Sequence, residues 1–543
     1  MKKCLLLLLF YCQLTTAQKL KKADKFIIEN LKSEIEFLAS DRLEGRRTGT
    51  EGEKIAYEYL AEQFKSLGLL PKGDNNTYLQ TFEINEGKEV LLSTYLTINE
   101  KKLSYEDEYF PFIFSALGTI QTNASPVFQE KDRPWFWDIK ELMKKNENNP
   151  HFHIEDAIKN KAIEFAKKGA TALIVYNTDE KDEGLKFEGK EKDESISIPV
   201  LFIKKAAAQK YLEDGTEALD ISLKVDIGNK IKEGHNVMGY IDNGVANTII
   251  IGAHYDHLGY GEDHNSLWTG ALSIHNGADD NASGTASVIE LARMLKKSTL
   301  KNNNYLFICF SGEELGLFGS KYFTAHPTIN LEAVNYMVNS DMIGRLNDTT
   351  HSLTIGGYGT SPSWGKIFNR KNKFFNAKFD SSGIGPSDHT SFYLKNIPVL
   401  FFFTGTHKDY HKPTDDAEKI NFTGELQIIK YIYGVIEETN KLEKVAFSKT
   451  KDPAMGSARF TVSLGIMPDY AFSGFGVRAD GIIEGKIAQK AGIHSGDIII
   501  KLGDFTFSDL NSYMNVLSKF KKGDATIVTV LRDNDQLTFD IVF

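Results

Sequence analysis

Cysteine is almost absent from this chain, whose 543 residues include three cysteines, Cys4, Cys12 and Cys309. The first two lie in an N-terminal segment that we expect to be removed, which would leave Cys309 alone. A disulfide-stapled secreted scaffold is thereby excluded, and so is a zinc site built from cysteines. Cys309 belongs to the apolar run Leu306–Phe310, which predicts a core residue rather than a nucleophile. Any metal would have to be bound by histidines and carboxylates.

Long apolar runs are also missing, apart from a short one at the N-terminus. Lys2 and Lys3 precede the apolar run Leu5–Tyr11, which is too short to span a bilayer. Thr15–Ala17 places small residues at both positions that a signal peptidase reads. Residues 1–17 are therefore interpreted as a signal peptide, and the mature protein is expected to be exported, to the periplasm or the extracellular space. No later run reaches membrane length, so no transmembrane segment is predicted.

Basic residues are outnumbered by acidic ones. The chain has 64 lysines and arginines against 73 aspartates and glutamates, which gives a formal net charge of −9. No arginine-rich or basic-aromatic stretch opposes this balance. Nucleic acid is therefore not an expected partner, because its phosphates select basic surfaces.

The length exceeds what one hydrophobic core supports and predicts three or four domains. Apolar residues at helical spacing predict two N-terminal helices, Lys25–Ser40 and Glu51–Leu67. A following module combines short strands with a charged helix: Tyr95–Ile98, Asp156–Lys168, Ala172–Tyr176 and Val200–Ile203. The expected parts are an N-terminal helical part of the main domain (18–84), an inserted β-rich domain (85–230), the rest of the main domain (231–442), a linker (443–457) and a C-terminal domain (458–543).

Strands and helices alternate between residues 235 and 440. Thr248–Ala253 is a continuous apolar run, which is typical of a strand buried on both faces. Similar strands are predicted at Tyr305–Phe310, Val334–Asn339 and Pro398–Phe403, and helices at Ser283–Lys297 and Gly424–Asn440. The alternation predicts an α/β domain with a mostly parallel sheet.

Histidines and carboxylates recur where these predicted strands end. They are His254, Glu313, Glu314, Asp341 and His411, in the order of the four strands, and Asp280 just before the first helix. Ligands of open α/β sheets bind at the carboxyl ends of the strands, so we expect these side chains to meet. Each one alone has an ordinary explanation, since a strand-terminal aspartate is often a helix cap. Two histidines and three carboxylates together suit zinc, and a pair of zinc ions needs a carboxylate that both share.

Six sequence runs around these residues carry a resemblance to a known family. They are GAHYDHLG, NGADDNASGT, SGEELGLFGS, NSDMIGR, PSDHTSF and DYHKPTDD. In this order, over about 200 residues, they resemble the zinc aminopeptidase family of the MH clan. Relatives in this family include secreted bacterial leucyl aminopeptidases, glutamate carboxypeptidase II, glutaminyl cyclase and the inactive transferrin receptor.

The resemblance implies a role for each matching residue of the metal site. His254 and Asp341 would hold one zinc ion, and Glu314 and His411 would hold the other. Asp280 would bridge the two ions, and the peptide bond after it is typically cis in the family. The implied cofactor is therefore two zinc ions per chain.

Three further residues receive catalytic roles from the same resemblance. Glu313 would be the general base, which takes a proton from zinc-activated water and passes it to the leaving amine. Asp256 would orient His254 through the second ring nitrogen. Tyr410 matches a tyrosine that stabilises the oxyanion in some relatives.

Other polar residues near these motifs are expected to be structural. Asp279 is not expected to be a ligand, because the bridging position of the family matches Asp280. The remaining candidates are assigned to rim, loop or supporting positions: His257, His264, His275, Asp388, His389 and Asp415.

The flanking modules resemble two further families. KKGATALIVYN and SIPVLFI resemble a protease-associated domain, although Trp135–Asn149 is charged and lacks the usual glycine-rich strand. SLGIMPDY and GVRADGIIEGKIAQKAGIHSGDIIIKLG resemble a PDZ domain. The resemblance implies that a loop binds a peptide or protein C-terminus beside a sheet edge; its residues are Ser463, Leu464, Gly465 and Ile466. The alternative is a module that only packs on the peptidase.

The favoured function is an exported di-zinc metallo-exopeptidase that removes N-terminal residues from peptide substrates. The alternatives are a carboxypeptidase or dipeptidase of the same family, a glutaminyl cyclase, and a catalytically inactive binding protein. A carboxypeptidase needs cations at the substrate carboxylate, and neither Arg345 nor another arginine is placed there by sequence. The cyclases typically use one zinc ion, whereas His254 and Asp341 are both present here. An inactive protein is disfavoured because every candidate ligand and Glu313 are present.

Overall fold

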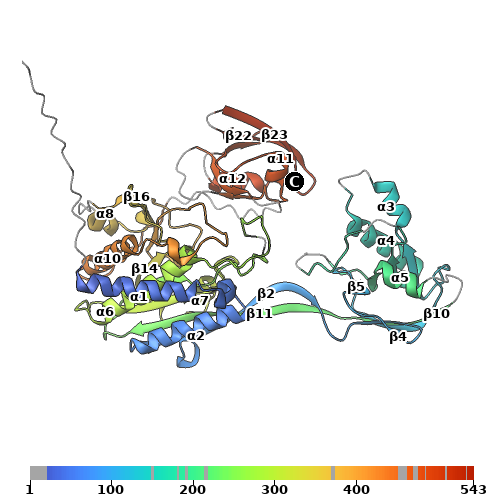
Figure 1. The fold of residues 1–543 in the computed structure, drawn as a ribbon, viewed down its shortest axis with the longest axis horizontal. Helices are drawn as coiled ribbons and strands as arrows, with labels where there is room; N and C mark the ends of the chain where they lie inside the picture. Colours follow the sequence, from blue (N-terminus) through green and yellow to red (C-terminus); the bar gives the residue numbers. More distant parts are fainter. Residues whose placement is uncertain are drawn as a thin grey trace, which may run out of the picture. The chain divides into compact units, whose positions relative to one another are not determined.

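The structure is a computed structural model (Figure 1). It describes residues 21–147, 152–179, 183–189, 194–212, 218–263, 265–368, 374–450, 462–468, 475–482, 485–507, 510–532 and 535–543, so the predicted signal peptide lies outside the described residues. An inserted unit, Glu83–Lys232, is compact in itself. The rest comprises an α/β region (21–82 and 233–450) and a C-terminal module (462–543).

A nine-stranded sheet forms the centre of the α/β region, in the order β1-β11-β13-β12-β14-β17-β15-β16, with β2 paired to β11. The strands are β1 (Leu70–Pro71), β2 (Leu79–Val90), β11 (Ile227–Ile241), β12 (Thr248–His254), β13 (Asn304–Phe310), β14 (Val334–Ser340), β15 (Ser352–Gly356), β16 (Asn376–Phe379) and β17 (Val399–Phe403). The neighbours β13, β12, β14 and β17 are parallel, whereas β11 and β15 join antiparallel. The predicted α/β fold with a mostly parallel sheet is confirmed.

Helices cover both faces of this sheet. They are α1 (Lys22–Leu38), α2 (Glu51–Ser66), α6 (Gly284–Lys296), α7 (Phe318–Ala325), α8 (Ser363–Phe368), α9 (His389–Tyr393) and α10 (Phe422–Thr439), with the short helices η1 (Asp41–Arg46), η2 (Asp74–Asn76), η3 (Ala278–Ser283), η4 (Leu331–Ala333), η5 (Tyr358–Thr360) and η6 (Ala417–Lys419). The helices α1, α6 and α10 pack together on one face, and α7 and α9 pack together on the other.

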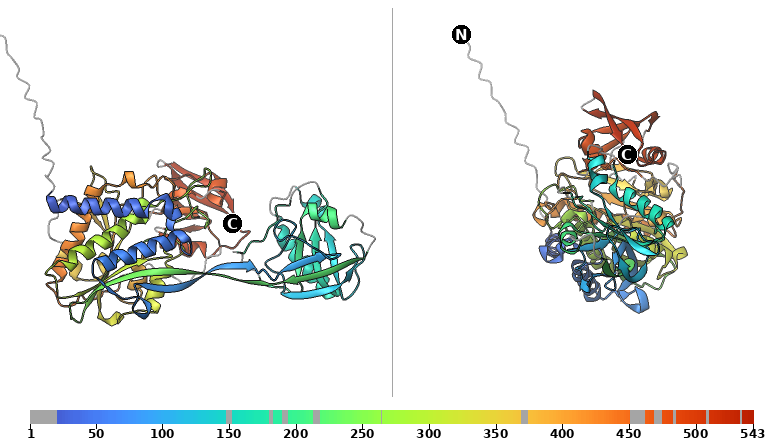
Figure 2. Two further views of the ribbon diagram at one scale, coloured as in Figure 1. Left: turned by 60° about the horizontal axis from the view of Figure 1, so that its bottom comes forward. Right: turned by 90° about the vertical axis from the view of Figure 1, so that its right-hand side faces the viewer.

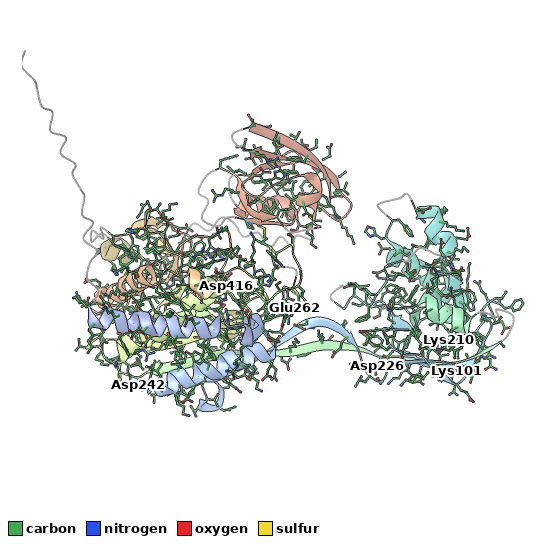
Figure 3. All side chains as sticks on the ribbon, viewed as in Figure 1. Lys101, Lys210, Asp226, Asp242, Glu262 and Asp416 are labelled. Atoms are coloured by element: carbon green, nitrogen blue, oxygen red, sulfur yellow. The ribbon has the colours of Figure 1, made fainter. Side chains whose placement is uncertain are left out.

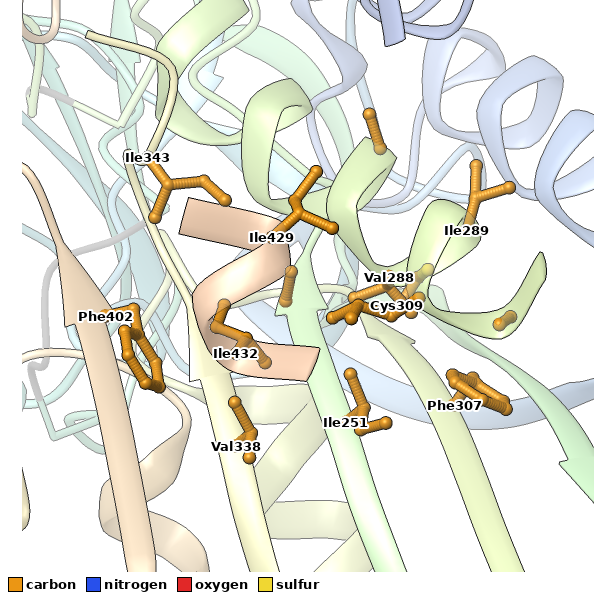
Figure 4. Packing of buried hydrophobic residues seen from close by; sticks show 14 of the residues in the cluster. Ile251, Val288, Ile289, Phe307, Cys309, Val338, Ile343, Phe402, Ile429 and Ile432 are labelled. Atoms are coloured by element: carbon orange, nitrogen blue, oxygen red, sulfur yellow. The ribbon is translucent and has the colours of Figure 1, made fainter. Parts of the chain in front are cut away.

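Successive residues of the central strands face opposite sides of the sheet. Ile251 of β12 packs in the core under α6 and α10, whereas Ile250 packs in the core on the other face. Both are fully buried, which explains the uninterrupted apolar run of β12. Cys309 lies in the first of these cores, near Ile251 and Phe307 (Figure 4), so the predicted core role is confirmed. Burial raises the pKa of its thiol, which makes it a poor nucleophile.

The inserted unit contains two four-stranded sheets, β4-β3-β10-β6 and β5-β9-β8-β7. Its elements are β3 (Tyr95–Ile98), β4 (Lys101–Lys102), β5 (Tyr109–Pro111), β6 (Gly118–Ala124), β7 (Arg133–Asp138), β8 (Ala170–Tyr176), β9 (Val200–Ile203), β10 (Leu219–Val225), α3 (Lys140–Asn146), α4 (Ile154–Lys168) and α5 (Lys205–Tyr211). The chain enters this unit along β2 and leaves it along β11, and these two strands pair with each other (Figure 2). Its surface carries exposed ion pairs such as Lys210–Glu108 (Figure 3).

The inserted unit contains a strand that was not predicted from the sequence. The stretch Trp135–Asn149 lacks the usual glycine-rich strand, but a strand of another composition, β7, begins at Arg133 and pairs with β8 in parallel. Trp135 and Phe136 of β7 are buried, so aromatic side chains take the place of the glycine-rich pattern. The charged residues that hid this strand in the sequence belong to α3, which follows it.

The C-terminal module folds around its own apolar core. Its elements are β18 (Ile466–Pro468), β19 (Val477–Ile482), β20 (Ile498–Leu502), β21 (Phe505–Thr506), β22 (Ala525–Arg532), β23 (Asp535–Val542), α11 (Ile487–Ala491) and α12 (Leu510–Leu517). The loop Ser463–Ile466 leads into β18, which forms one edge of the sheet. None of the helices in the described parts of the chain is long and apolar enough to cross a membrane.

The first part of the predicted linker packs on the α/β region. Val445 is buried, and its backbone N–H donates to Asn335 Oδ1 at 2.7 Å. The N–H of Ser448 donates to the carbonyl of Thr360 at 2.8 Å. Residues 443–450 are therefore a structural part of this region, whereas residues 451–457 of the predicted linker lie outside the described residues.

Candidate metal centre

The five predicted ligands come together at the carboxyl end of the parallel strands. His254 ends β12, Asp280 lies in η3 before α6, and the other three follow β13, β14 and β17. The parallel pairing of these strands places all four strand ends at one edge of the sheet. Little of their side chains is exposed: His254 1%, Asp280 5%, His411 6%, Glu314 7% and Asp341 13%. The peptide bond between Asp280 and Asn281 is cis, as the resemblance implied.

Three ligand atoms surround one candidate position. His254 Nε2 lies 3.4 Å from Asp280 Oδ1 and 3.5 Å from Asp341 Oδ1. These distances exceed those of ordinary hydrogen bonds. Two atoms that each bind a tetrahedral zinc ion at about 2.0–2.1 Å lie about 3.3–3.4 Å apart, so the observed spacing suits a shared ion.

A second set of atoms repeats this spacing on the other side of Asp280. His411 Nε2 lies 3.3 Å from Asp280 Oδ2 and 3.4 Å from Glu314 Oε2. Asp280 therefore directs one oxygen towards His254 and the other towards His411. This is the arrangement expected of a carboxylate that is shared by two ions.

Backbone carbonyls determine which nitrogen each histidine ligand offers. His254 Nδ1 lies 3.1 Å from the carbonyl oxygen of Asp256, and His411 Nδ1 lies 2.8 Å from that of Asn265. A carbonyl can only accept, so both Nδ1 atoms carry the proton and donate it. The lone pair of each ring is then on Nε2, which is the atom that faces the carboxylates.

His257, for which a rim or loop position was expected, is buried beside the ligand candidates. It is 1% exposed, and its Nδ1 lies 2.9 Å from Glu314 Oε1 and 3.9 Å from Asp280 Oδ2. The atoms of His257, Asp280 and Glu314 are close enough to share an ion. However, 2.9 Å is a hydrogen-bond distance, and a donating Nδ1 has no lone pair for a metal. We therefore assign His257 to the orientation of Glu314 and keep His411 as the ligand.

Asp256 supports the site in a different way from the one implied. Its carboxylate lies 3.7 Å from His254 Nδ1, too far for a hydrogen bond, and the ring instead contacts the Asp256 backbone carbonyl. The carboxylate accepts from the backbone N–H groups of Glu313 at 3.2 Å and Glu314 at 3.4 Å. Asp256 thus joins the loop after β12 to the loop after β13, which carries the base candidate and a ligand candidate.

Two buried aspartates, Asp415 and Asp279, position the backbone around Asp280. Asp415 Oδ2 accepts from the N–H groups of Asp279 at 2.9 Å and Asp280 at 3.0 Å. Asp279 itself accepts from Gly344 N at 2.6 Å and lies 3.1 Å from His407 Nε2, which agrees with its expected structural role. Burial and the neighbouring Asp279 raise the pKa of Asp415 to about 7.

Arg46 is a buried cation behind the metal site that the sequence did not reveal. It is fully buried, and its guanidinium donates to backbone carbonyls of Leu38, Tyr255, Asn276 and Gly277. It thereby ties the residue after His254 to the segment before Asp280. Burial lowers the pKa of Arg46 to about 10, while Asp256 and Asp280 oppose this shift, so it remains charged at neutral pH.

Thr48 and Glu53 extend this support to the loop after β13. Thr48 Oγ1 donates to Asp256 Oδ2 at 3.1 Å and accepts from the N–H of Gly312 at 3.0 Å. Glu53 Oε1 accepts from the hydroxyls of Ser311 at 2.6 Å and Tyr255 at 3.1 Å. Burial raises the pKa of Glu53 to about 7. The segment of residues 46–53 therefore holds the back of the site, although it lies about 200 residues away in the sequence.

A pocket opens directly beside these groups. Its lining includes Glu313, Tyr410, the five ligand candidates, an apolar set (Met342, Ile384, Pro386, Phe401 and Phe403) and the polar residues Thr354, Asp380, Ser382, His389 and Thr406. Glu313 Oε2 lies 3.9 Å from His254 Nε2, and burial raises the pKa of the Glu313 carboxyl well above its usual range. The ring of Tyr410 stacks on that of His411 with centroids 3.9 Å apart. None of the described residues that line this pocket is a lysine or an arginine.

The remaining candidates are placed as follows. Arg345 lies 3.1 Å from Asp409 Oδ2, one residue before Tyr410. His389 lines the pocket, and its ring stacks on Phe401 with centroids 4.5 Å apart. Asp388 is buried, and so is His275, whose Nε2 lies 2.6 Å from Ser266 Oγ. His264 lies outside the described residues.

Comparisons with known families agree with this architecture. Residues 236–436 match Peptidase family M28, residues 146–211 match the PA domain, and residues 453–542 match the PDZ domain.

Individual relatives cover only parts of the chain. Aminopeptidase YwaD of Bacillus subtilis (strain 168) is 27% identical over 298 residues, which are 51% of this chain and 58% of that protein. Leupeptin-inactivating enzyme 1 of Streptomyces exfoliatus is 28% identical over 239 residues, 43% of this chain and 49% of that protein. The chain thus spans about half the length of the curated relatives it matches. Among solved structures, BSAP, a zinc aminopeptidase from Bacillus subtilis, has a TM-score of 0.42 at 22% identity, over 78% of this chain and 96% of that one.

Proposed function

Because residues 236–436 form a domain of Peptidase family M28, joined to a PA domain and a PDZ domain, we propose that this chain is an exported zinc aminopeptidase. His254 and Asp341 would hold one zinc ion, Glu314 and His411 a second, and Asp280 both. The observation that carries the proposal is the spacing of 3.3–3.5 Å between the histidine Nε2 atoms and the carboxylate oxygens on either side of Asp280.

The residues of the chain itself divide the work of hydrolysis. Bound zinc supplies a polarised substrate carbonyl and a water of lowered pKa. Glu313 is the base: its Oε2 accepts a proton from the attacking water and returns it to the leaving amine. Asp256 holds the backbone of Glu313 and Glu314, so the two adjacent carboxylates keep separate roles. Tyr410, which lines the pocket, is proposed to donate a hydrogen bond to the developing oxyanion.

The charges around the pocket favour an aminopeptidase over a carboxypeptidase. A C-terminal carboxylate is usually recognised by arginine or lysine. The lining contains neither among its described residues, and Arg345 is paired with Asp409. The presence of both ligand pairs and of Glu313 likewise supports hydrolysis over cyclisation or binding alone. The relative named Aminopeptidase YwaD fits the same choice.

For the C-terminal module we propose peptide binding at the loop Ser463–Ile466. The loop precedes β18, an edge strand whose outer side can accept a further strand. Gly465 has φ +75°, and a Cβ there would lie 2.2 Å from Lys486 Cβ, so only glycine fits this turn. Truncating the C-terminal residue of a bound peptide should abolish binding to this loop, as measured by fluorescence anisotropy.

Export is proposed from the N-terminal leader alone. The mature protein recovered from the native host should begin at Gln18, as measured by N-terminal sequencing. A protein that retains Met1 in the cell would contradict this part of the proposal.

A panel of blocked and unblocked peptides tests the activity. The wild-type protein should release the N-terminal residue from aminoacyl p-nitroanilides and from peptides with a free N-terminus. It should not act on the same peptides after N-acetylation, and 1,10-phenanthroline should stop the reaction until zinc is restored. Cleavage of N-acetylated peptides from the C-terminus would contradict the aminopeptidase proposal, and insensitivity to the chelator would contradict the metal site.

A further inference from the structure

One wall of the pocket is formed by a loop far from the metal ligands in sequence. Asp380, Ser382 and Ile384–Pro386 line the pocket together with Phe401 and Phe403 of β17. The loop is attached to residues 355–359 by backbone hydrogen bonds, including Gly357 N to Ser382 O at 2.9 Å and Asp380 N to Ile355 O at 3.0 Å. Its position therefore depends on what packs behind it.

Tyr393 is the residue that packs behind this wall. A Cβ at Gly383 would lie 2.1 Å from Tyr393 Cδ2, so the ring lies directly against the backbone of the loop. Tyr393 is 3% exposed and ends α9, the helix that begins with the pocket residue His389. Its ring centroid is 5.7 Å from that of Phe447, in the segment 443–450.

Thr450 joins this tyrosine and the wall to the segment that continues towards the PDZ domain. The backbone N–H of Thr450 donates to the Tyr393 hydroxyl at 3.1 Å, and Thr450 Oγ1 lies 2.8 Å from the same hydroxyl. The N–H of Gly383 reaches Thr450 Oγ1 at 3.5 Å, which is a weak contact. A Cβ at Gly359, on the neighbouring strand connection, would lie 3.2 Å from Thr450 Cγ2. Thr450 thus contacts both backbone segments that form the wall.

We propose that Thr450 and Tyr393 are positioning residues for the substrate pocket, so that the chain between the M28 and PDZ domains takes part in substrate recognition. Their contacts given above are with the wall and not with a ligand candidate, and they act by holding the Asp380–Pro386 wall against the substrate side chain. The inference rests on the proposed function, because the pocket is taken to hold the side chain of the N-terminal residue. A large side chain would reach the wall, whereas an alanine side chain would not.

The test uses the full-length, zinc-loaded protein with two variants that each remove one hydroxyl. Tyr393→Phe keeps the ring against Gly383, and Thr450→Val keeps the side-chain volume. Both should raise KM for leucyl and phenylalanyl substrates by about three- to tenfold, the effect of one lost hydrogen bond, with kcat changed less than about twofold. KM for alanyl substrates should not change. Thr450→Ser keeps the hydroxyl and should keep the wild-type KM. Ser448→Ala is the matched control and should also keep it, because the hydrogen bond of Ser448 to Thr360 is made by its backbone N–H.

A second readout separates this inference from the proposed activity. Hydrogen exchange of the peptide that covers Asp380–Pro386 should be faster in Thr450→Val than in the wild type and unchanged in Ser448→Ala. If the wild-type protein cleaved none of the substrates, the proposed function would be overturned. The exchange result alone would then show whether Thr450 holds the Asp380–Pro386 wall in place. Equal KM changes for all substrates, a loss of kcat with unchanged KM, or unchanged exchange in this loop would overturn the inference.

Discussion

Two clusters of buried charged groups lie in the α/β region, and they are held in different ways. At the carboxyl edge of the sheet, Asp256 accepts from two backbone N–H groups and a hydroxyl, and Asp415 accepts from two backbone N–H groups. The cation behind them, Arg46, donates only to backbone carbonyls in the hydrogen bonds described above. Backbone N–H groups and the hydroxyl therefore supply the short contacts of these two carboxylates, while Arg345 Nη1 and His407 Nε2 lie farther away, 3.8 Å and 3.9 Å from Asp415 Oδ1.

Among α1, α6 and α10, the second cluster relies on a single cation. Arg293 lies 3.0 Å from Glu34 Oε1 and 2.6 Å from Glu290 Oε1. Glu425 is fully buried, and neither of its oxygens has a hydrogen-bond partner among the described residues. Burial and like charge raise the pKa of Glu34 and of Glu425 well above the usual range. In the cluster at the metal site, backbone donors therefore orient the carboxylates. In the cluster among α1, α6 and α10, the buried carboxylates lower the stability of the fold.

The largest effect is expected from Asp280→Ala, which removes the carboxylate shared by both candidate positions. The protein should bind fewer than two zinc ions per chain and lose its peptidase activity, because each position loses one of its ligand atoms. Elemental analysis after gel filtration and the aminoacyl assay measure the two effects. Two zinc ions retained per chain would show that Asp280 does not bridge.

The next largest effect is expected from Glu313→Gln, which keeps the shape of the side chain and removes its basicity. The value of kcat should fall by about 10²–10⁴-fold, with zinc content unchanged. Glu262→Gln, an exposed change in the loop before Asp280 (Figure 3), is the control and should keep full activity. Unchanged turnover in Glu313→Gln would refute its role as the base.

Arg46→Gln tests whether the cation behind the site is needed for stability. Several backbone carbonyls would lose a charged donor, so the free energy of unfolding of the metal-free protein should fall by about 2–4 kcal/mol. Zinc affinity, measured by chelator competition, should fall as well, because the segments that carry His254 and Asp280 would no longer be tied together. Arg46→Lys keeps the charge but not the planar guanidinium. Its free energy of unfolding should lie between those of the wild type and Arg46→Gln. Wild-type stability in Arg46→Gln would contradict this reading of the cluster.

The smallest effect, and the one of opposite sign, is expected from Glu425→Gln. Because burial raises the pKa of Glu425 in the folded state, its contribution to stability is complete below the unfolded pKa of about 4.3 and is lost as pH rises through the raised value. The glutamine variant does not ionise, so it should be more stable than the wild type by about 1–2 kcal/mol at pH 8 and nearly equal to it at pH 4. Urea unfolding at both pH values measures the difference. A variant less stable than the wild type at pH 8 would show that the carboxylate has a partner that stabilises it.

The central strands of the fold were predictable because they are buried on both faces. Their apolar runs are continuous, and the predicted β12 and β13 differ from the observed strands by one residue at one end. The strand β7 was not predictable, because charged residues of the adjoining α3 follow it directly and mask its short apolar run. The polar composition of residues 443–450 likewise predicted a linker, although this segment packs through its backbone and through Val445.

The metal site was predictable to the extent that its residues lie at strand ends. His254, Glu314, Asp341 and His411 follow strands, so their convergence was expected from the parallel sheet. The supporting residues leave no such signal. Arg46 binds backbone carbonyls, which any sequence can provide, and Thr48 reaches Gly312 across more than 260 residues of chain. The contact of His257 with Glu314 was not predictable either, because the sequence of a loop does not show which way a histidine side chain points.

The most direct test of the two-ion site is the zinc content of the purified full-length protein. The protein is stripped with chelator, reloaded with excess zinc, separated from free metal, and analysed by mass spectrometry of the element. The shared position of Asp280 predicts two zinc ions per wild-type chain, with aminopeptidase activity restored on reloading. One zinc ion or none per active chain would contradict the account.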